Sequence, residues 1–269
     1  MSDATGPRRA SPLMEFTAAV IFLTRIPIPW RGNWPADLAE RAFAWFPLVG
    51  GLIGAAGGVA YWAFSSAGLP PWLSAACTVA ALVWLTGALH EDGLADVADG
   101  MGGGRDREQK LSIMKDSRIG TYGAAALILS FAMRIGALAA IAEPRAVALA
   151  LIGAHAFSRG LLPALKAVLP DARPTGASAS QGRPNHARAL VAAVIGISLA
   201  ATALGKLDPM GGGAGLLILA VSAASASPLI AMARRQLGGI TGDVLGASQQ
   251  VSELAFLLAL VGALSHAGL

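Results

Sequence analysis

Long apolar segments dominate this sequence and restrict what it can fold into. Seven stretches of about 17 to 26 residues are mostly apolar, and a helix needs about that length to cross roughly 30 Å of hydrocarbon. Charged residues make up only 13% of the chain, and the segments are apolar nearly all round instead of on one face. The predicted spans are Phe43–Gly68, Trp72–Leu89, Thr121–Ala142, Ala146–Leu169, Ala189–Gly205, Gly213–Ala233 and Val251–Leu269.

The expected fold class is therefore an all-α, polytopic integral membrane helix bundle with about seven transmembrane helices. The short apolar run Phe16–Thr24 is followed by Arg25 and the sequence IPIP. It is predicted to form an additional N-terminal helix at the membrane interface and not a signal sequence. The sequence shows no second domain and no internal repeat, so residues 1–269 are expected to form one membrane-embedded domain.

The distribution of Lys and Arg predicts the orientation in the membrane. Fifteen of the 20 lie in the N-terminal region or in alternate connections near residues 90–120, 170–188 and 234–250, and only Arg145 and Lys206 lie in the others. The positive-inside rule then places the N-terminus and these loops in the cytoplasm, and the C-terminus outside. This asymmetry also explains the pI of 9.7, so no nucleic-acid partner is expected.

The connection between residues 90 and 120 concentrates charge in a chain that has little of it. If the helix continues out of the second span, Asp92, Asp96 and Asp99 fall at i, i+4 and i+7 and share one face. Like charges at this spacing repel, so the stripe favours a bound cation, and its oxygen ligands favour Mg²⁺ or Mn²⁺. The alternative is a solvated acidic cap at the membrane boundary.

A glycine run follows the acidic stripe. Gly102, Gly103 and Gly104 permit a tight path with positive φ, in which backbone N–H groups can approach an anion. These residues are therefore candidates for substrate binding. A glycine run is also typical of a flexible linker, and the sequence leaves both interpretations open.

The third feature of this connection is a Lys-Asp-Ser-Arg sequence before the third span. Lys115 and Arg118 lie at i, i+3 and are candidates to clamp a diphosphate, the arginine through its planar fork. Asp116 could orient Lys115, complete a metal site or accept a proton. Anchoring by the positive-inside rule would explain the two cations but not Asp116.

Polar residues in or near the predicted spans are the remaining candidates. Arg159, four residues after His155, is expected to face the bundle interior and is a candidate substrate-binding residue, whereas the histidine suits a structural role. Arg134 has no polar neighbour in the sequence. Asp243 follows a Gly-rich turn, where it could bind substrate or cap a helix. Glu253 lies just inside the last span, where a carboxylate is costly.

Five segments make the chain similar to the cobalamin synthase family (adenosylcobinamide-GDP ribazoletransferase, or cobalamin-5′-phosphate synthase). The resemblance extends nearly end to end, and its most specific part is the pattern HxDGxADxxDG followed by IMKDSRIGTYG. The segments are FLTRIPIP (22–29), FPLVGGLIG (46–54), HEDGLADVADG (90–100), KLSIMKDSRIGTYG (110–123) and GGITGDVLGA (238–247).

The resemblance implies a Mg²⁺-dependent enzyme of the bacterial inner membrane. It would join adenosylcobinamide-GDP to α-ribazole or its 5′-phosphate and release GMP, with the main active-site motif of its single catalytic domain on the cytoplasmic loop 90–120. The acidic stripe would hold Mg²⁺, while Lys115, Arg118 and Arg159 would hold phosphate oxygens. Asp99 or Asp116 would be the general base. The choice of lower-ligand base stays open, as does the oligomeric state, a homo-oligomer included.

Two other functions fit parts of the sequence. A CDP-alcohol phosphotransferase shares the DxxDG pattern at residues 96–100, but the Ala-Arg that should follow and the later GxxxDxxxD are missing at the required spacing. An ion-coupled transporter would place its charges near the bilayer midplane between broken helices. Here seven of the 16 acidic residues cluster in one loop, which favours the transferase.

Overall fold

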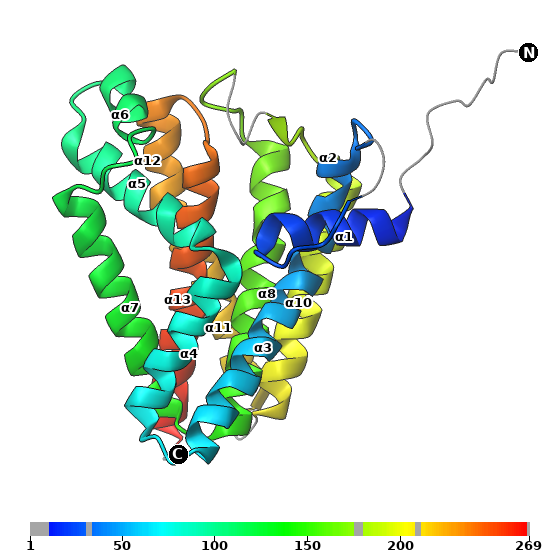
Figure 1. The fold of residues 1–269 in the computed structure, drawn as a ribbon, viewed down its shortest axis with the longest axis vertical. Helices are drawn as coiled ribbons and strands as arrows, with labels where there is room; N and C mark the ends of the chain where they lie inside the picture. The colour runs from blue at the N-terminus through cyan, green and yellow to red at the C-terminus, as the bar shows by residue number, and fades with distance from the viewer. Residues whose placement is uncertain (1–10, 31–33, 175–179, 208–210, 268–269) are drawn as a thin grey trace, which may run out of the picture.

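The computed structural model describes residues 11–30, 34–174, 180–207 and 211–267, and their regular structure is almost entirely helical (Figure 1). The helices are α1 (Pro12–Leu23), α2 (Leu38–Ala42), η1 (Phe43–Trp45), α3 (Phe46–Ser66), α4 (Pro71–Thr86), α5 (Leu89–Gly103), α6 (Arg107–Ile113), α7 (Thr121–Ile141), α8 (Pro144–Val168), α10 (His186–Lys206), α11 (Gly211–Ser225), α12 (Ser227–Leu237) and α13 (Gly242–His266). Figure 1 shows the long helices side by side, with α6, α12 and much of α5 gathered at one end of the bundle.

The membrane-spanning helices agree with the predicted fold class. Within the described residues, six helical segments are long and apolar enough to cross a membrane, and the bent pair α4–α5 makes a seventh if it counts as one span. The predicted sixth span corresponds to α11 and α12 together. The end of the predicted last span, at residues 268–269, lies outside the described residues.

The predicted interfacial helix is α1, which lies across the long helices (Figure 1). Ser11 Oγ accepts a hydrogen bond from the N–H of Met14 at 3.3 Å, and Pro12 occupies the first turn, where its missing N–H costs nothing. The helix ends at Thr24, which has extended φ and ψ angles. The prolines that follow do not favour further helix, so the chain leaves α1 in an extended form.

Helices α3 and α8 pack closely along their length, and glycines permit this close packing. Gly50, Gly54 and Gly58 recur every four residues along α3 and face the backbone of α8. A Cβ at any of these positions would collide with α8, at the carbonyls of His155 and Leu151 or at Ala148. Close backbone approach through small residues is the usual way in which helices associate in lipid.

The chain bends sharply where the sequence predicted a helix continuing out of the second span. Gly87 and Ala88 both have left-handed backbone angles, with φ of 67° and 57°, and α5 turns by 91° from α4. The N–H of Arg25 donates to the carbonyl of Leu85 at 2.8 Å, and the Arg25 side chain packs over Gly87, where a Cβ would collide with it. Because helix resumes at Leu89, the predicted common face of the three aspartates is retained but points in a new direction.

The last helix begins at Gly242, well before the predicted start at Val251. Thr241 Oγ1 accepts a hydrogen bond from the N–H of Val244 at 3.2 Å and caps the helix. The hydropathy pattern did not indicate the first turns of α13, because these turns are polar. The structure buries their polar residues, which include Ser248, Gln249, Gln250, Ser252 and Glu253, inside the bundle.

Candidate active site

Glycines bring α13 against α5, and this contact builds the candidate site. A Cβ on Gly93 would lie only 2.9 Å from the carbonyl oxygen of Asp243, and one on Gly246 would lie 3.4 Å from Cα of His90. The close approach requires the missing side chain of Gly93, whereas a Cβ on Gly246 would make only an ordinary van der Waals contact. Asp243 therefore lies beside the helix that carries the predicted acidic stripe.

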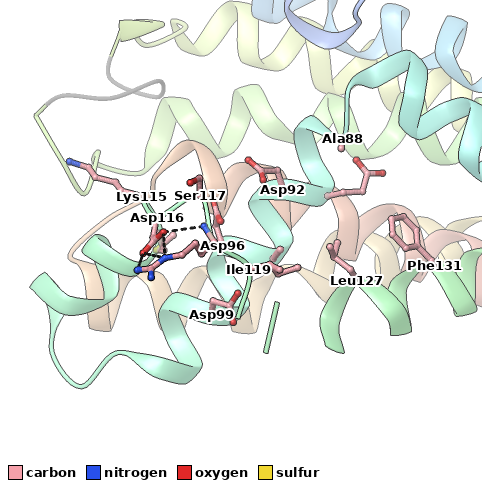
Figure 2. A pocket seen from close by; sticks show the side chains of 14 residues that line it. Ala88, Asp92, Asp96, Asp99, Lys115, Asp116, Ser117, Ile119, Leu127 and Phe131 are labelled. Carbon is pink, nitrogen blue, oxygen red and sulfur yellow. Dashed lines mark hydrogen bonds and ion pairs between the residues drawn. The ribbon is translucent and has the colours of Figure 1, made fainter. Parts of the chain in front are cut away.

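A cavity of about 420 Å³, the carboxylate pocket, opens beside α5 (Figure 2). It brings together six residues that the sequence predicted for metal binding, proton transfer or diphosphate binding. The polar residues that line it are Glu91, Asp92, Asp96, Asp99, Lys115, Asp116, Ser117 and Arg118. Apolar residues complete the wall: Ala88, Ala95, Met114, Ile119, Leu127 and Phe131.

Asp96 is the most strongly perturbed carboxylate in this pocket. It lies on α5, beyond the break that separates this helix from α4. Burial, followed by the negative charges of Asp92, Asp243 and Asp99, raises its pKa to about 7. Neither Asp92 nor Asp96 makes a side-chain hydrogen bond to another described residue, so this end of the stripe holds uncompensated negative charge.

Asp99 has a different environment, because backbone N–H groups donate hydrogen bonds to both oxygens of its carboxylate. Its oxygens accept hydrogen bonds from the N–H of Gly120 at 2.7 Å and of Gly123 at 2.8 Å, at the start of α7. A Cβ at either glycine would collide with this carboxylate. Asp99 thus caps α7 from a neighbouring helix. Its roles as metal ligand and as general base stay predictions that this geometry does not favour.

Asp116 and Arg118 pair with each other at the rim of the pocket. The guanidinium donates to both carboxylate oxygens, with Nε at 3.1 Å and Nη2 at 2.6 Å, and this lowers the pKa of Asp116 to about 2. Such a carboxylate is a weak base, and the Arg118 side chain is 87% exposed. In Figure 2 the Lys115 side chain extends away from the acidic stripe. These cations line the opening of the pocket and not its floor.

The glycine run differs from the predicted path. Gly102 and Gly103 are the last residues of α5, and Gly104 has φ of −84°, so none has the positive φ that the sequence suggested. The small size of Gly102 and Gly104 serves packing instead, because a Cβ on Gly102 would lie 2.6 Å from the ring of Tyr122, and one on Gly104 would collide with Lys110. None of the three lines the carboxylate pocket. Their anion-binding role stays a prediction without support from this geometry.

A short backbone pairing places Arg173 beside Asp243. The N–H of Ala172 donates to the carbonyl of Ile240, and the N–H of Ile240 donates to that of Pro170, both at 2.8 Å. Arg173 Nη2 then lies 3.7 Å from the Asp243 carboxylate, and its side chain is only 15% exposed. Its Nε and Nη2 are buried and lack a hydrogen-bond partner among the described residues. The sequence assigned Arg173 only to membrane topology, since nothing local distinguishes it from other loop arginines.

Comparison with known proteins shows the family to which this chain belongs. A family model described as cobalamin-5-phosphate synthase matches residues 15–261. The chain belongs to this family. A relative from Rhizobium etli is 46% identical over 258 residues, covering 93% of this chain and 97% of its own length. One from Bradyrhizobium diazoefficiens is 45% identical over 247 residues, covering 91% and 92%. Both relatives carry the name adenosylcobinamide-GDP ribazoletransferase, and no solved structure matches the chain.

The donor atoms in the carboxylate pocket fit a magnesium ion held mainly by substrate and water. In the part of the chain that the structure describes, no three His, Cys, Asp or Glu side chains converge as a ready-made metal cage. Mg²⁺ does not need one, because one or two carboxylates commonly bind it together with substrate phosphates and waters. Asp92 and Asp96 are one helical turn apart, and their carboxylates have no hydrogen-bond partner among the described residues, so they supply such oxygens. A cation there would neutralise the charge that raises the pKa of Asp96.

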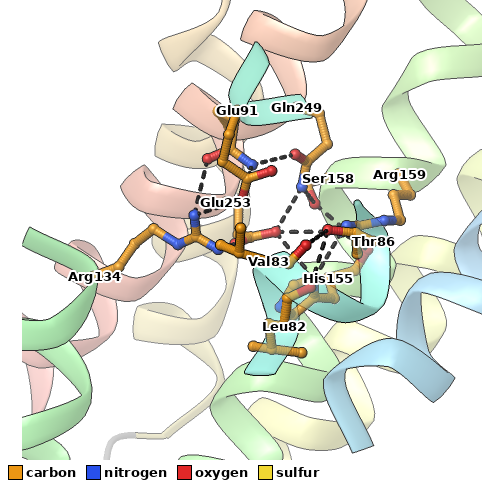
Figure 3. Close-up of polar contacts among 11 residues, drawn as sticks. Leu82, Val83, Thr86, Glu91, Arg134, His155, Ser158, Arg159, Gln249 and Glu253 are labelled. Atoms are coloured by element: carbon orange, nitrogen blue, oxygen red, sulfur yellow. Dashed lines mark hydrogen bonds and ion pairs between the residues drawn. The ribbon is translucent and has the colours of Figure 1, made fainter. Parts of the chain in front are cut away.

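A second polar cluster lies deeper in the bundle, and we call it the buried ion network (Figure 3). Arg134 Nη1 donates to Glu91 Oε1 at 2.8 Å and to Gln250 Oε1 at 3.2 Å, and its Nη2 lies 3.4 Å from Glu253. The sequence offered Arg134 no polar neighbour, because its partners come from α5 and α13. The network consists of Glu91, Arg134, His155, Ser158, Arg159, Gln249, Gln250 and Glu253.

Arg159 belongs to this network and not to the carboxylate pocket. Its Nη1 lies 2.7 Å from His155 Nδ1 and 3.2 Å from Glu253 Oε2, and the residue is 1% exposed. Gln249 donates to Ser158 at 2.9 Å and to Glu253 at 2.6 Å, which closes the cluster. The predicted burial of Arg159 in the bundle interior is confirmed. Its predicted contact with substrate phosphate stays a prediction that this position does not favour.

Proposed function

We propose that the carboxylate pocket is where this chain carries out adenosylcobinamide-GDP ribazoletransfer, a late step of cobalamin biosynthesis. The observation that carries the proposal is the pair Asp92 and Asp96, which have no side-chain partner in the described part of the chain and share one cavity with Lys115 and Arg118. Phosphoryl transfer needs positioning and charge neutralisation more than covalent help from the protein. This pocket offers negative charge for a cation and positive charge for phosphates.

The reaction forms one P–O bond and breaks another. A ribose hydroxyl of ribazole, or of its 5′-phosphate, attacks the phosphorus attached to cobinamide, GMP leaves with the bridging oxygen, and the hydroxyl proton is released. Asp92 and Asp96 would hold Mg²⁺, which when bound neutralises the diphosphate and the leaving phosphate. The chain's own task is to hold the two reacting groups in line.

The positively charged residues divide that task between them. Lys115 and Arg118 at the rim would hold the phosphate of the leaving GMP, where solvent can replace it. Arg173, whose Nε and Nη2 are buried and have no hydrogen-bond partner among the described residues, would hold a diphosphate oxygen at the other end of the acidic stripe. Asp99 and Asp116 act as positioning residues, because one caps α7 and the other orients Arg118.

The orientation of the chain is part of the proposal. The Lys and Arg distribution supports a cytoplasmic N-terminus and 90–120 loop and an external C-terminus in the bacterial inner membrane. The pocket would then face cytoplasmic substrates. Cys77, the single cysteine, can be replaced by serine, and a new cysteine placed at Arg105. An impermeant maleimide added to intact cells should leave it unlabelled and should label it after lysis. Labelling from outside would contradict this orientation.

The activity itself is tested with purified protein in liposomes. Adenosylcobinamide-GDP, α-ribazole and Mg²⁺ together should release GMP, and omission of any one of them should stop the release. Parallel reactions with α-ribazole 5′-phosphate decide which acceptor is preferred. Release of CMP from a CDP-alcohol, with no GMP from the corrinoid substrate, would reject the proposal.

A further inference from the structure

A second, largely apolar recess shares Asp92 with the carboxylate pocket. It consists of two cavities of about 390 Å³ and about 230 Å³, which share Phe22, Phe46, Leu89 and Gln181 in their walls. We call the two together the apolar recess. Interfacial helix α1 and helix α2 cover its outer part, where Ala18 and Ala39 line it.

The inner end of the recess is polar and reaches the acidic stripe. Asp92, His90 and Asp243 line the smaller cavity, and Asp92 also lines the carboxylate pocket. His90 is 3% exposed, and its Nδ1 is buried without a hydrogen-bond partner among the described residues. An apolar cavity that ends in an unpartnered ring nitrogen and two carboxylates is shaped for a ligand with an apolar body and a polar end.

We propose that the apolar recess binds the aromatic base of the acceptor nucleoside and that its ribose lies against His90, Asp92 and Asp243. This assignment rests on the proposed function and adds the acceptor site to it. Phosphoryl transfer requires the attacking and leaving oxygens to lie roughly in line on opposite sides of phosphorus. Asp92 lines both cavities, so a nucleotide diphosphate in one and an acceptor in the other would meet beside this carboxylate.

The chemistry of the walls matches this occupant. A planar aromatic heterocycle gains binding energy from burial against aromatic side chains, and Phe22 and Phe46 are stacked at 5.5 Å between ring centroids at the recess. A ribose supplies hydroxyl donors for Asp92 and Asp243 and a hydroxyl acceptor or donor for His90 Nδ1. The recess also opens beside an interfacial helix, so a phospholipid acyl chain is the competing occupant, and the experiment separates the two.

The first test fills the recess. Ala39→Trp should place an indole in the larger cavity, and Ala36→Trp, an exposed position just before α2 that lines neither cavity, is the matched control. Ala39→Trp should raise the KM for α-ribazole at least tenfold and leave the KM for adenosylcobinamide-GDP within twofold of wild type. The control should change neither. An unchanged acceptor KM in Ala39→Trp, or an equal rise for both substrates, would overturn the assignment.

A second variant keeps the proposal testable if Ala39→Trp fails to fold. Phe22→Ala opens the recess without adding bulk, and it should raise the acceptor KM severalfold while the donor KM stays unchanged. Each variant is also compared with wild type by thermal unfolding in detergent. If the recess holds lipid, both KM values stay at the wild-type level and the filled variant retains less co-purified phospholipid, which rejects the assignment.

Direct binding separates this inference from the proposed function. Equilibrium dialysis of radiolabelled α-ribazole against the detergent-solubilised wild type and Ala39→Trp needs no turnover. Binding that the variant loses, without any GMP release by the wild type, would support the recess and reject the proposed reaction. Normal turnover with equal α-ribazole binding by both proteins would support the reaction and reject the recess.

Discussion

Glu91 and Asp92 are adjacent on α5, yet they belong to two polar regions with opposite properties. Glu91 is 4% exposed and accepts a hydrogen bond from Arg134 at 2.8 Å inside the bundle, whereas Asp92 is exposed and has no side-chain partner among the described residues. The buried ion network balances its charges internally, with two glutamates against two arginines. The carboxylate pocket leaves charge uncompensated, and uncompensated charge can bind a ligand.

The two regions also depend on each other. The network joins α5, α7, α8 and α13 near the middle of the bundle, and the same α5 carries the acidic stripe. Buried ion pairs contribute little net stability, because desolvation offsets much of the attraction, but losing one partner is costly. The network therefore fixes where α5 and α13 lie, and the pocket uses that position. Four variants separate these roles.

The largest effect is expected from the double substitution Asp92→Asn with Asp96→Asn. Loss of the cation-binding carboxylates should lower kcat/KM by about 10⁴-fold, or roughly 5.5 kcal/mol of transition-state stabilisation. The unfolding temperature should stay the same or rise, because mutual repulsion is removed. GMP release and thermal unfolding measure the two quantities. Glu108→Gln, an exposed acid in the same connection, is the control. Near-normal turnover in the double variant would exclude a carboxylate-held metal at this stripe.

The reverse pattern is expected from Glu253→Gln in the buried ion network. The substitution removes the charge that Arg134 and Arg159 share and should cost about 3 to 5 kcal/mol of folding stability. A large fall in unfolding temperature and in the yield of monodisperse protein should result. His266→Gln, an exposed change at the other end of α13, serves as control. A variant as stable as wild type, but without activity, would move Glu253 from the network's structural role into the chemistry.

Arg173→Ala should produce an intermediate effect, mostly on catalysis. Loss of a charge-assisted hydrogen bond to phosphate is typically worth about 1.5 to 3 kcal/mol, so kcat/KM should fall by roughly 10- to 150-fold. Arg183→Ala tests whether any cation of the same connection matters, since that side chain is 42% exposed. Equal losses in the two variants would show that general positive charge, and not the position of Arg173 beside Asp243, supports activity.

The smallest effect is expected from Arg118→Lys. The substitution keeps the charge and the topology signal but loses the planar fork that binds Asp116 through two nitrogens. We expect kcat/KM to fall about tenfold, or about 1.4 kcal/mol, with normal membrane insertion. The change in kcat/KM is measured by initial rates across a range of adenosylcobinamide-GDP concentrations. Wild-type values throughout would leave membrane anchoring as the only role of Arg118.

The sequence by itself determined the fold class and most of the pocket. Apolar segments of membrane-crossing length predict a helical bundle because backbone groups in lipid must be satisfied within their own segment. The spacing of Asp92, Asp96 and Asp99 is a property of one helix, so local geometry sufficed to place them together. The Lys115–Arg118 segment follows in the chain and lines the same cavity.

Only the tertiary structure decided what each charged residue does. Asp99 caps α7, Arg134 and Arg159 share Glu253, and Arg173 lies beside Asp243, and each contact joins elements that are distant in the sequence. The sequence pattern does not distinguish Asp96 from Asp99, but only Asp99 contacts the N-terminus of another helix. Periodicity reports the face of a helix on which a residue lies. The charges and donors packed against that face decide whether the residue is neutralised by the protein or left to bind a ligand.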